Sequence, residues 1–265
     1  MGIRIIQWNI KHNSDSDYIA KFLVKQIQGI TIVQLQEVTV GHYQLIHSVL
    51  KPSASVHSLS MRPRGKFEGK NRELGVATFV FGGELLGSNL LNRSVFPERT
   101  LVTELLISDK VIRTLNFHSL TGVGYKQAKS SNFSSIADYL YEYPIDFFSC
   151  DANEPSKDAF VEEDLVFFDN GDKGKCASLL FGVDKVHTLR DVWRTHQELI
   201  LLNQGSNLNA IELPISYVIN NRISKRYDFI FASADWKPKT VKYLFDESIA
   251  ASSDHSMVIA DLISV

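Results

Sequence analysis

The chain opens with two strand-like segments that flank one helix-like segment, and this order constrains the fold more than any other feature. Residues 3–8 (IRIIQW) and 30–35 (ITIVQL) are short and apolar, which is typical of buried strands. Residues 17–27 carry apolar side chains at helical spacing, and Ser16 or Asp17 is suited to cap the N-terminus of such a helix. A strand, a helix and a second strand in this order favour a layered α/β fold.

The rest of the chain predicts more strands than helices. A helix is expected over residues 41–50 and a longer one over 126–142. Strands are expected at residues 56–61, 74–81, 84–96, 101–107, 111–117, 145–150, 227–232, 240–245 and 257–262. No repeat or linker divides these segments, so residues 1–265 are predicted to form one domain of two mixed sheets packed face to face, with helices outside. The polar stretch 203–221 shows no interpretable pattern.

Composition excludes several classes of protein. Hydrophobic residues make up 44% of the chain, enough for a substantial core, and a formal net charge of -2 excludes a strongly basic coat for nucleic acid. Two cysteines, Cys150 and Cys176, are too few for a disulfide framework or a cysteine-rich metal site. No signal peptide, transmembrane segment or obligate protein partner is indicated, and the expectation is a cytoplasmic protein.

Polar side chains stand at the ends of several predicted strands, where a strand interior would not tolerate them. The segments are WN at residues 8–9, QE at 36–37, NFHS at 116–119, SCDAN at 149–153, RYDFI at 226–230 and SSDHS at 252–256. Carboxylates and histidines at the strand ends of a layered fold tend to converge on one crevice. The sequence therefore predicts one polar cleft to which all six segments contribute.

Phosphoester hydrolysis assisted by a hard divalent cation is the chemistry that suits these residue types. Mg²⁺ prefers oxygen ligands and keeps several waters, so one or two carboxylates suffice. Glu37 is the best candidate ligand and Asp254 the next, while Asn9 can bind the metal or orient its shell. The expected cofactor is Mg²⁺ or Mn²⁺.

Proton transfer and phosphate binding need further groups. His255 and His118 are the candidates for acid–base catalysis, Asp151 can hold the attacking water, and Asn153 can donate an amide N–H to a phosphate oxygen. Each motif alone also has an ordinary structural explanation. Asp151 and Asn153 can form a cap or turn, and Asp228 can simply pair with Arg226.

Six segments, taken in order, resemble the signature blocks of the endonuclease/exonuclease/phosphatase superfamily. They are QWNI, QEV, NFHS, CDAN, RYDFIF and SDHSMV, and the match extends from Asn9 to His255. The superfamily includes pancreatic-type deoxyribonucleases, abasic-site endonucleases, neutral sphingomyelinases and inositol-polyphosphate phosphatases. The resemblance implies a four-layer α/β/β/α sandwich, which agrees with the strand pattern above.

The resemblance also implies roles for residues near a metal and a phosphate. Glu37 resembles the metal-binding glutamate, Asn9 its neighbouring asparagine and Asp254 a metal-side aspartate. Asp151 and Asn153 resemble the pair that orients the water and contacts the scissile phosphate.

Four further residues carry implied roles around the two histidines. His255 resembles the histidine that acts as base or phosphate ligand, and Asp228 the carboxylate that orients it. His118 resembles the second histidine of the deoxyribonuclease and sphingomyelinase branches, and Glu73 the carboxylate that orients that second ring. Lys11 departs from the pattern, because abasic-site nucleases carry an aspartate at its position.

The substrate is expected to be a phosphoester, with DNA and RNA as the leading candidates. Residues 61–72 (MRPRGKFEGKNR) form a basic segment in which Arg62, Arg64 and Arg72 can grip a phosphate backbone, although a solvated loop explains the same pattern. The sequence favours a nuclease-like, Mg²⁺-dependent phosphodiesterase. Two alternatives stay open: a phospholipid, sphingomyelin or inositol-phosphate phosphoesterase on the same site, and a catalytically inactive binding module.

Overall fold

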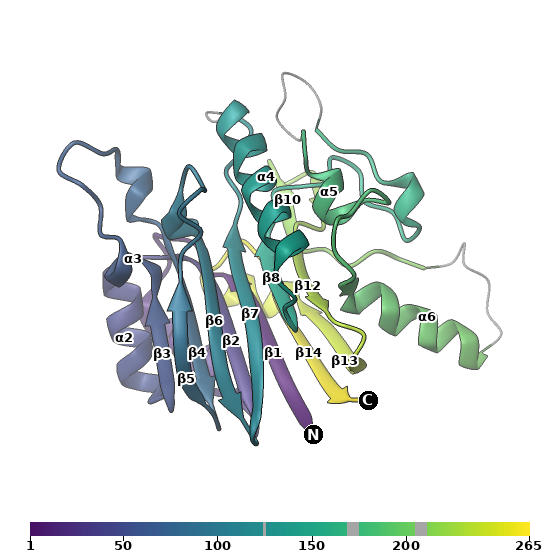
Figure 1. Cartoon of the computed structure of the whole chain (residues 1–265), viewed down its shortest axis with the longest axis horizontal. Helices are drawn as coiled ribbons and strands as arrows, with labels where there is room; N and C mark the ends of the chain where they lie inside the picture. Colours follow the sequence, from purple (N-terminus) through teal and green to yellow (C-terminus); the bar gives the residue numbers. More distant parts are fainter. Residues whose placement is uncertain (124–125, 169–174, 205–210) are drawn as a thin grey trace.

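Two mixed β-sheets packed face to face form the centre of the computed structural model, which describes residues 1–123, 126–168, 175–204 and 211–265 (Figure 1). Across these ranges each sheet has six strands. The first has the order β13 (Trp236–Leu244), β14 (Met257–Ser264), β1 (Gly2–Asn9), β2 (Thr31–Val38), β4 (Gly75–Phe81) and β3 (Ala54–His57). The second has the order β5 (Glu84–Asn89), β6 (Thr100–Ile107), β7 (Lys110–His118), β8 (Phe147–Asp151), β12 (Asp228–Ala232) and β9 (Arg190–Asp191).

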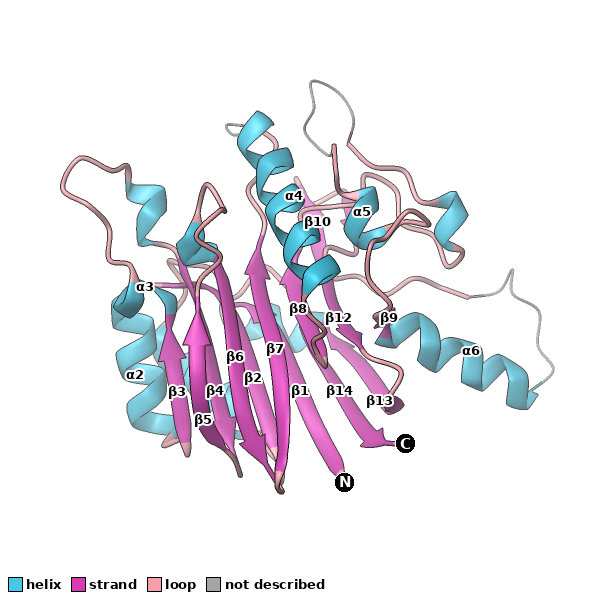
Figure 2. Cartoon of the chain, viewed as in Figure 1, coloured by secondary structure: helices cyan, strands magenta, loops and turns pink. Residues whose placement is uncertain are grey.

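Helices cover the outer faces of both sheets (Figure 2). Shared apolar clusters hold α1 (Ser16–Val24) and α2 (Val40–Leu50) on the first sheet, and α4 (Lys126–Glu142) and α5 (Ser178–Phe181) on the second. The other helical elements are α6 (Val192–Gln204), α3 (Ser58–Met61), α7 (Phe245–Ala250) and the 3₁₀ turns η1 (Lys70–Glu73), η2 (Pro97–Arg99) and η3 (Glu162–Asp164). The layers confirm the predicted α/β/β/α sandwich.

The space between the two sheets changes from apolar to polar along the strands. Ile5, Ile32 and Leu105 belong to an apolar cluster that joins the sheets at one end. Nearer to the ends of β1 and β2, buried amides and hydroxyls take over: Gln7, Gln34, Gln36, Thr114 and Asn116. Their hydrogen bonds cross between the sheets, because buried polar groups need partners. The ends of the central strands, which carry the polar motifs, therefore stand on a polar interior.

Three local predictions differ from the structure. Residues 56–61 were expected to form one strand, but β3 ends at His57 and α3 follows, where Ser58 Oγ donates to Glu98 O and accepts the N–H of Val76. The expected strand over 84–96 ends at Asn89, and the next residue, Leu90, is buried in an apolar cluster with Val76 and Leu101. The cap of α1 is Asp15 rather than either of the two residues that follow it.

The stretch 203–221 lies partly outside the described residues. Its described part contains β10 (Tyr217–Ile219), which pairs with β11 (Ile223–Lys225) as a hairpin. Over the described part of the chain, no helix combines the length and the apolar character that crossing a membrane requires.

Candidate active site

Asp228 and His255 form a hydrogen-bonded pair at the start of β12 and before β14. Asp228 is fully buried and His255 is 6% exposed. Nδ1 of His255 lies 2.8 Å from Asp228 Oδ2, so the ring proton at Nδ1 points to the carboxylate. Burial by itself lowers the pKa of His255, but the carboxylates of Asp228 and Asp151 outweigh it and raise the pKa to about 10. The ring therefore carries a positive charge at neutral pH.

Arg226 is not the partner of Asp228. Its guanidinium donates two hydrogen bonds to the carboxylate of Asp191, at 2.7 and 2.6 Å, and one to Asp158 at 3.2 Å. Its Nε donates to Tyr243 Oη, whose own O–H donates to the backbone oxygen of Asp228. Arg226 thus anchors the strand behind the site, and the Asp228 carboxylate is left to His255.

Asp151, the last residue of β8, lies between the two histidines. Its Oδ2 accepts a hydrogen bond from Asn9 Nδ2 (2.8 Å) and its Oδ1 accepts the backbone N–H of Asn153 (3.1 Å). The same Oδ2 lies 3.6 Å from His118 Nε2 and 3.9 Å from His255 Nε2. Burial raises the pKa of Asp151 to about 7, although the charge of His255 opposes it. A carboxyl group with a pKa near neutrality is suited to take a proton from water.

His118, at the end of β7, has a cation where His255 has a carboxylate. Nη1 of Arg99 lies 3.2 Å from His118 Nδ1. A guanidinium only donates hydrogen bonds, so Nδ1 accepts and the ring proton sits on Nε2. Burial first and the charge of Arg99 second lower the pKa of His118 to about 3. His118 is therefore a neutral ring with its N–H on the side of Asp151 and Glu37.

The resemblance implied that Glu73 orients His118, and the structure places Arg99 there instead. The side chain of Glu73 is 51% exposed and forms an ion pair with Arg64. Arg99 comes from η2, where the sequence FPERT carries no strand-end signal. Arg99 is a residue that the motifs could not identify.

Glu37 reaches the site because β2 is irregular at its end. The register with β4 shifts between Leu35 and Val38, and Glu37 adopts a φ of 57°. Such a bulge re-aims a side chain. Burial alone would raise the pKa of Glu37, but the nearby His118 ring and hydrogen bonds from the backbone and ring of His12 lower it to about 2. The hydrogen bonds from His12 stabilise the Glu37 carboxylate whatever the charge of the His118 ring.

Oxygen donors from three predicted metal ligands gather around the turn after β1. The backbone N–H of Lys11 donates to Asn9 Oδ1 (2.9 Å), and Lys11 Nζ lies 3.5 Å from Asp254 Oδ2. The next residue, His12, donates from its backbone to Glu37 Oε2 (3.0 Å). An ionised carboxylate beside an amide and a second carboxylate is a hard donor set, which fits Mg²⁺ or Mn²⁺.

A second possible ligand group overlaps with the histidine pair. Asp151, Asp228 and His255 offer ligand atoms within 4.8 Å of one another. However, Asp228 Oδ1 already accepts from Gln7 and Oδ2 from His255, each at 2.8 Å. A protonated imidazole has no lone pair left for a cation. Asp228 and His255 are thus already bonded to each other, and a metal site at the donors around Glu37 stays a prediction.

The basic segment before β4 is held by ion pairs with one carboxylate of its own and two from neighbouring residues. The ion pairs are Arg62–Glu68, Arg62–Glu98, Arg64–Glu73 and Arg72–Glu98. Glu98 is fully buried, so these contacts fasten the loop to η2. Phe67 is 94% exposed within the loop. Substrate binding by these arginines stays a prediction, since the pairs already compensate part of their charge.

Tyr217, from the hairpin β10–β11, covers one face of His255. The two rings stack with centroids 4.6 Å apart and an interplanar angle of 26°. Ser216 fixes the hairpin to the site, because its Oγ accepts the N–H groups of Tyr227 and Asp228 and its carbonyl accepts the N–H of Ser256. Sequence reasoning missed Tyr217, since the surrounding stretch shows no pattern.

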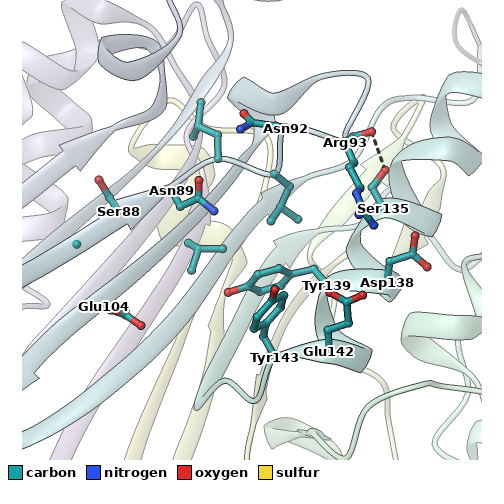
Figure 3. A pocket seen from close by; sticks show the side chains of 14 residues that line it. Ser88, Asn89, Asn92, Arg93, Glu104, Ser135, Asp138, Tyr139, Glu142 and Tyr143 are labelled. Atoms are coloured by element: carbon teal, nitrogen blue, oxygen red, sulfur yellow. Dashed lines mark hydrogen bonds between the residues drawn. The ribbon is translucent and has the colours of Figure 1, made fainter.

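A separate pocket of about 610 Å³ lies between α4 and the strands β5 and β6 (Figure 3). It is lined by the stacked rings of Tyr139 and Tyr143, whose centroids are 5.0 Å apart, and by Glu104 and Glu142. It contains none of the predicted site residues. This pocket is thus separate from the group of predicted site residues at the strand ends.

The fold has counterparts among solved structures. No protein-family model matches the sequence, and no curated protein sequence matches it. Among solved structures, D. rerio TDP2 complexed with single strand DNA product is 14% identical, covers 99% of both chains and has a TM-score of 0.68. A Bacteroides vulgatus endonuclease/exonuclease/phosphatase is 16% identical over 100% of both chains, with a TM-score of 0.66.

The catalytic domain of human Nocturnin with bound sulfate anion is similar to the same degree. It is 17% identical, covers 100% of this chain and 95% of its own, and has a TM-score of 0.65. These similarities extend over the whole length of the chain and include both sheets and their covering helices. The protein has the fold of the endonuclease/exonuclease/phosphatase superfamily.

Proposed function

We propose that the protein is a divalent-metal-dependent phosphodiesterase that cleaves a nucleic-acid strand. The observation that carries this proposal is the joint placement of a charged His255 and a buried Asp151 beside the ionised Glu37. A positive donor, a carboxyl group that can accept a proton and a hard metal ligand are the three groups that in-line hydrolysis of a phosphodiester needs.

Glu37, Asn9 and Asp254 would hold the metal ion. The bound ion would supply positive charge to the phosphate oxygens. His12 fixes the Glu37 carboxylate through its backbone N–H, and Lys11 fixes the Asn9 side chain in the same way. These second contacts orient the oxygen donors before any ion arrives.

The protonation states of Asp151, His255 and His118 indicate the remaining roles in the proposed reaction. Asp151 takes a proton from the attacking water, because burial has raised its pKa to about 7. The water oxygen bonds to phosphorus as the bond to the leaving oxygen breaks, and the leaving oxygen takes a proton from solvent, to which Asp151 later returns its own. His255 is already protonated at neutral pH, so its Nε2 donates a hydrogen bond to the phosphate and does not act as a base. His118 adds a neutral N–H donor on the other side of Asp151. Asn153 can donate its side-chain amide to a phosphate oxygen.

The nucleic-acid substrate is the finer part of the proposal. A similar structure, D. rerio TDP2, was solved with single strand DNA product. An inactive binding module is disfavoured, because buried polar groups such as Asp151 and Asp228 cost stability when they serve no purpose.

A hydrolysis screen tests the proposal and separates the substrate classes. The purified protein is offered single-stranded DNA, RNA, sphingomyelin vesicles, inositol phosphates and bis(p-nitrophenyl) phosphate, with Mg²⁺ or Mn²⁺ and with excess chelator. We expect metal-dependent cleavage of the activated diester and of a nucleic acid, and a sharp loss with Glu37→Gln. Full activity in chelator rules out the metal role, and hydrolysis of only the lipid or the inositol phosphate overturns the substrate class.

A further inference from the structure

The buried amides beneath the site form one hydrogen-bonded chain that ends on Asp228. Asn116 Nδ2 donates to the backbone oxygens of Leu35 (3.1 Å) and Ala77 (2.9 Å). Asn116 Oδ1 accepts from Gln36 Nε2 (2.8 Å), and Gln36 Oε1 accepts from Gln7 Nε2 (2.8 Å). The second N–H of Gln7 Nε2 is directed at Asp228 Oδ1, also at 2.8 Å.

The direction of every amide in this chain is forced. Backbone carbonyls only accept, so Asn116 must present its nitrogen to Leu35 and Ala77 and its oxygen to Gln36. Gln36 must then present nitrogen to Asn116 and oxygen to Gln7. Gln7 in turn faces both Gln36 and Asp228 with its nitrogen. The hydrogen-bond pattern therefore determines which end of each side-chain amide is nitrogen and which is oxygen, a choice that otherwise has to be assigned.

This orientation of the Gln7 amide is unfavourable for its oxygen, and the hydrogen bond to Asp228 offsets that loss of stability. Gln7 Oε1 is buried and has no hydrogen-bond partner among the described residues. An unsatisfied buried oxygen destabilises a protein, and hydrogen bonds to a charged group are stronger than those between neutral groups. The bond from Gln7 to the Asp228 carboxylate offsets that loss, because turning the amide over would bring two oxygens together.

We propose that Gln7, held by Gln36 and Asn116, is a positioning residue that orients Asp228 and through it His255. The proposal deepens the proposed function and rests on it for its kinetic consequences. Gln7 fixes Oδ1, which leaves Oδ2 aimed at His255 Nδ1. The carboxylate is thus clamped at both oxygens, and the sheet backbone sets its rotation.

Gln7→Met tests whether Gln7 positions Asp228, and Gln34→Met is its matched control. Methionine keeps the length of glutamine but removes the donor. Gln34 is equally buried in the same layer, but its Nε2 donates to Thr114 Oγ1 (3.0 Å), away from Asp228. We expect Gln7→Met to lower kcat on bis(p-nitrophenyl) phosphate about tenfold or more with little change in KM, and Gln34→Met to stay within about twofold.

A spectroscopic measurement keeps the test independent of activity. The proton on His255 Nδ1 should give a downfield NMR signal, identified by its loss in His255→Ala. Gln7→Met should shift this signal at fixed pH, and Gln34→Met should not. Equal effects of both variants on kcat and on the signal would overturn the positioning role of Gln7 and would show that both residues act through packing alone. If the protein hydrolyses no phosphodiester, the proposed function fails, whereas the signal still decides whether Gln7 positions Asp228.

Discussion

The two buried histidines of the site stand in opposite electrical environments. His255 meets a carboxylate at Nδ1, Asp228 Oδ2 at 2.8 Å, and its pKa is raised to about 10. His118 meets the guanidinium of Arg99 at Nδ1, at 3.2 Å, and its pKa is lowered to about 3. Both rings nevertheless point Nε2 at the same oxygen, Asp151 Oδ2. At neutral pH one ring is therefore a cation and the other a neutral donor.

The difference shows that two equally buried histidines can hold opposite protonation states when the groups at their Nδ1 atoms carry opposite charges. Both rings are buried, and burial alone lowers the pKa of each. A carboxylate reverses that effect for His255, whereas Arg99 adds to it for His118. Asp151 is thus placed between a charged and an uncharged N–H. In the hydrolysis proposed above, Asp151 is therefore the group best suited to gain a proton.

Removing the charged ring should have the largest effect. His255→Ala is expected to lower kcat at least about a hundredfold, the low end for a general acid–base contribution. Asp228→Asn should keep the fold but lose a large share of the same rate, because an amide supplies no negative charge. Steady-state kinetics on bis(p-nitrophenyl) phosphate with saturating Mg²⁺ measures both.

The double variant decides whether the two residues act as a unit. If they do, His255→Ala combined with Asp228→Asn should lose little more than His255→Ala alone. A loss equal to the product of the two single losses means that they act independently and removes Asp228 from the site.

Replacing the neutral ring should cost less and should be partly repairable. His118→Phe is expected to lower kcat about tenfold, in line with the loss of one neutral donor. His118→Gln should recover part of that loss, since an amide N–H can replace a neutral imidazole N–H. His255→Gln should recover nothing, because it supplies no charge. If His118→Gln and His255→Gln recover the same share of kcat, the two rings do not act as a neutral and a charged donor.

The strand-end motifs predicted two histidines for the candidate site, and the structure places both near Asp151, but the motifs did not predict what each ring faces. Strand periodicity and polar strand ends locate residues along the chain, and parallel and antiparallel pairing then brings those ends together. On that basis the sequence placed Asp151 and His255 in one cleft. Arg99, Gln7 and Tyr217 could not be found in this way, because their roles depend on contacts between distant segments. For the same reason the sequence predicted Glu73, and not Arg99, as the residue beside His118.

Changing the cation beside His118 should have a moderate effect. Arg99→Met removes the positive charge at Nδ1 and should raise the pKa of His118 from its present value of about 3, while Arg99→Lys should keep it low. An NMR titration of the His118 ring in chelator measures the change. We expect a loss of a few-fold in kcat for Arg99→Met, because the Nε2–H tautomer is no longer enforced. An unchanged titration curve means that burial alone determines the state of His118.

The last expected effect is on stability, and it has opposite signs for the two rings. The folded-state pKa of His255 lies above the unfolded value of about 6.5, so its contribution is fully present below pH 6.5 and is lost as pH rises toward 10. For His118 the folded-state pKa lies below the unfolded value. The unfolded chain therefore binds the extra proton, and stability falls as pH drops from about 6.5 toward 3.

Urea unfolding in chelator, with matched asparagine variants, measures both windows. His255→Asn should be less stable than the wild type at pH 6, and that deficit should shrink by at least about 1 kcal/mol at pH 9, where the wild type is losing the contribution of the charged ring. His118→Asn should lose less stability than the wild type between pH 6 and pH 4, because it lacks the group that must stay neutral. Parallel curves for wild type and His255→Asn would mean that Asp228 does not hold a charged ring. The contrast between the two histidines would then reduce to the single effect of Arg99 on His118.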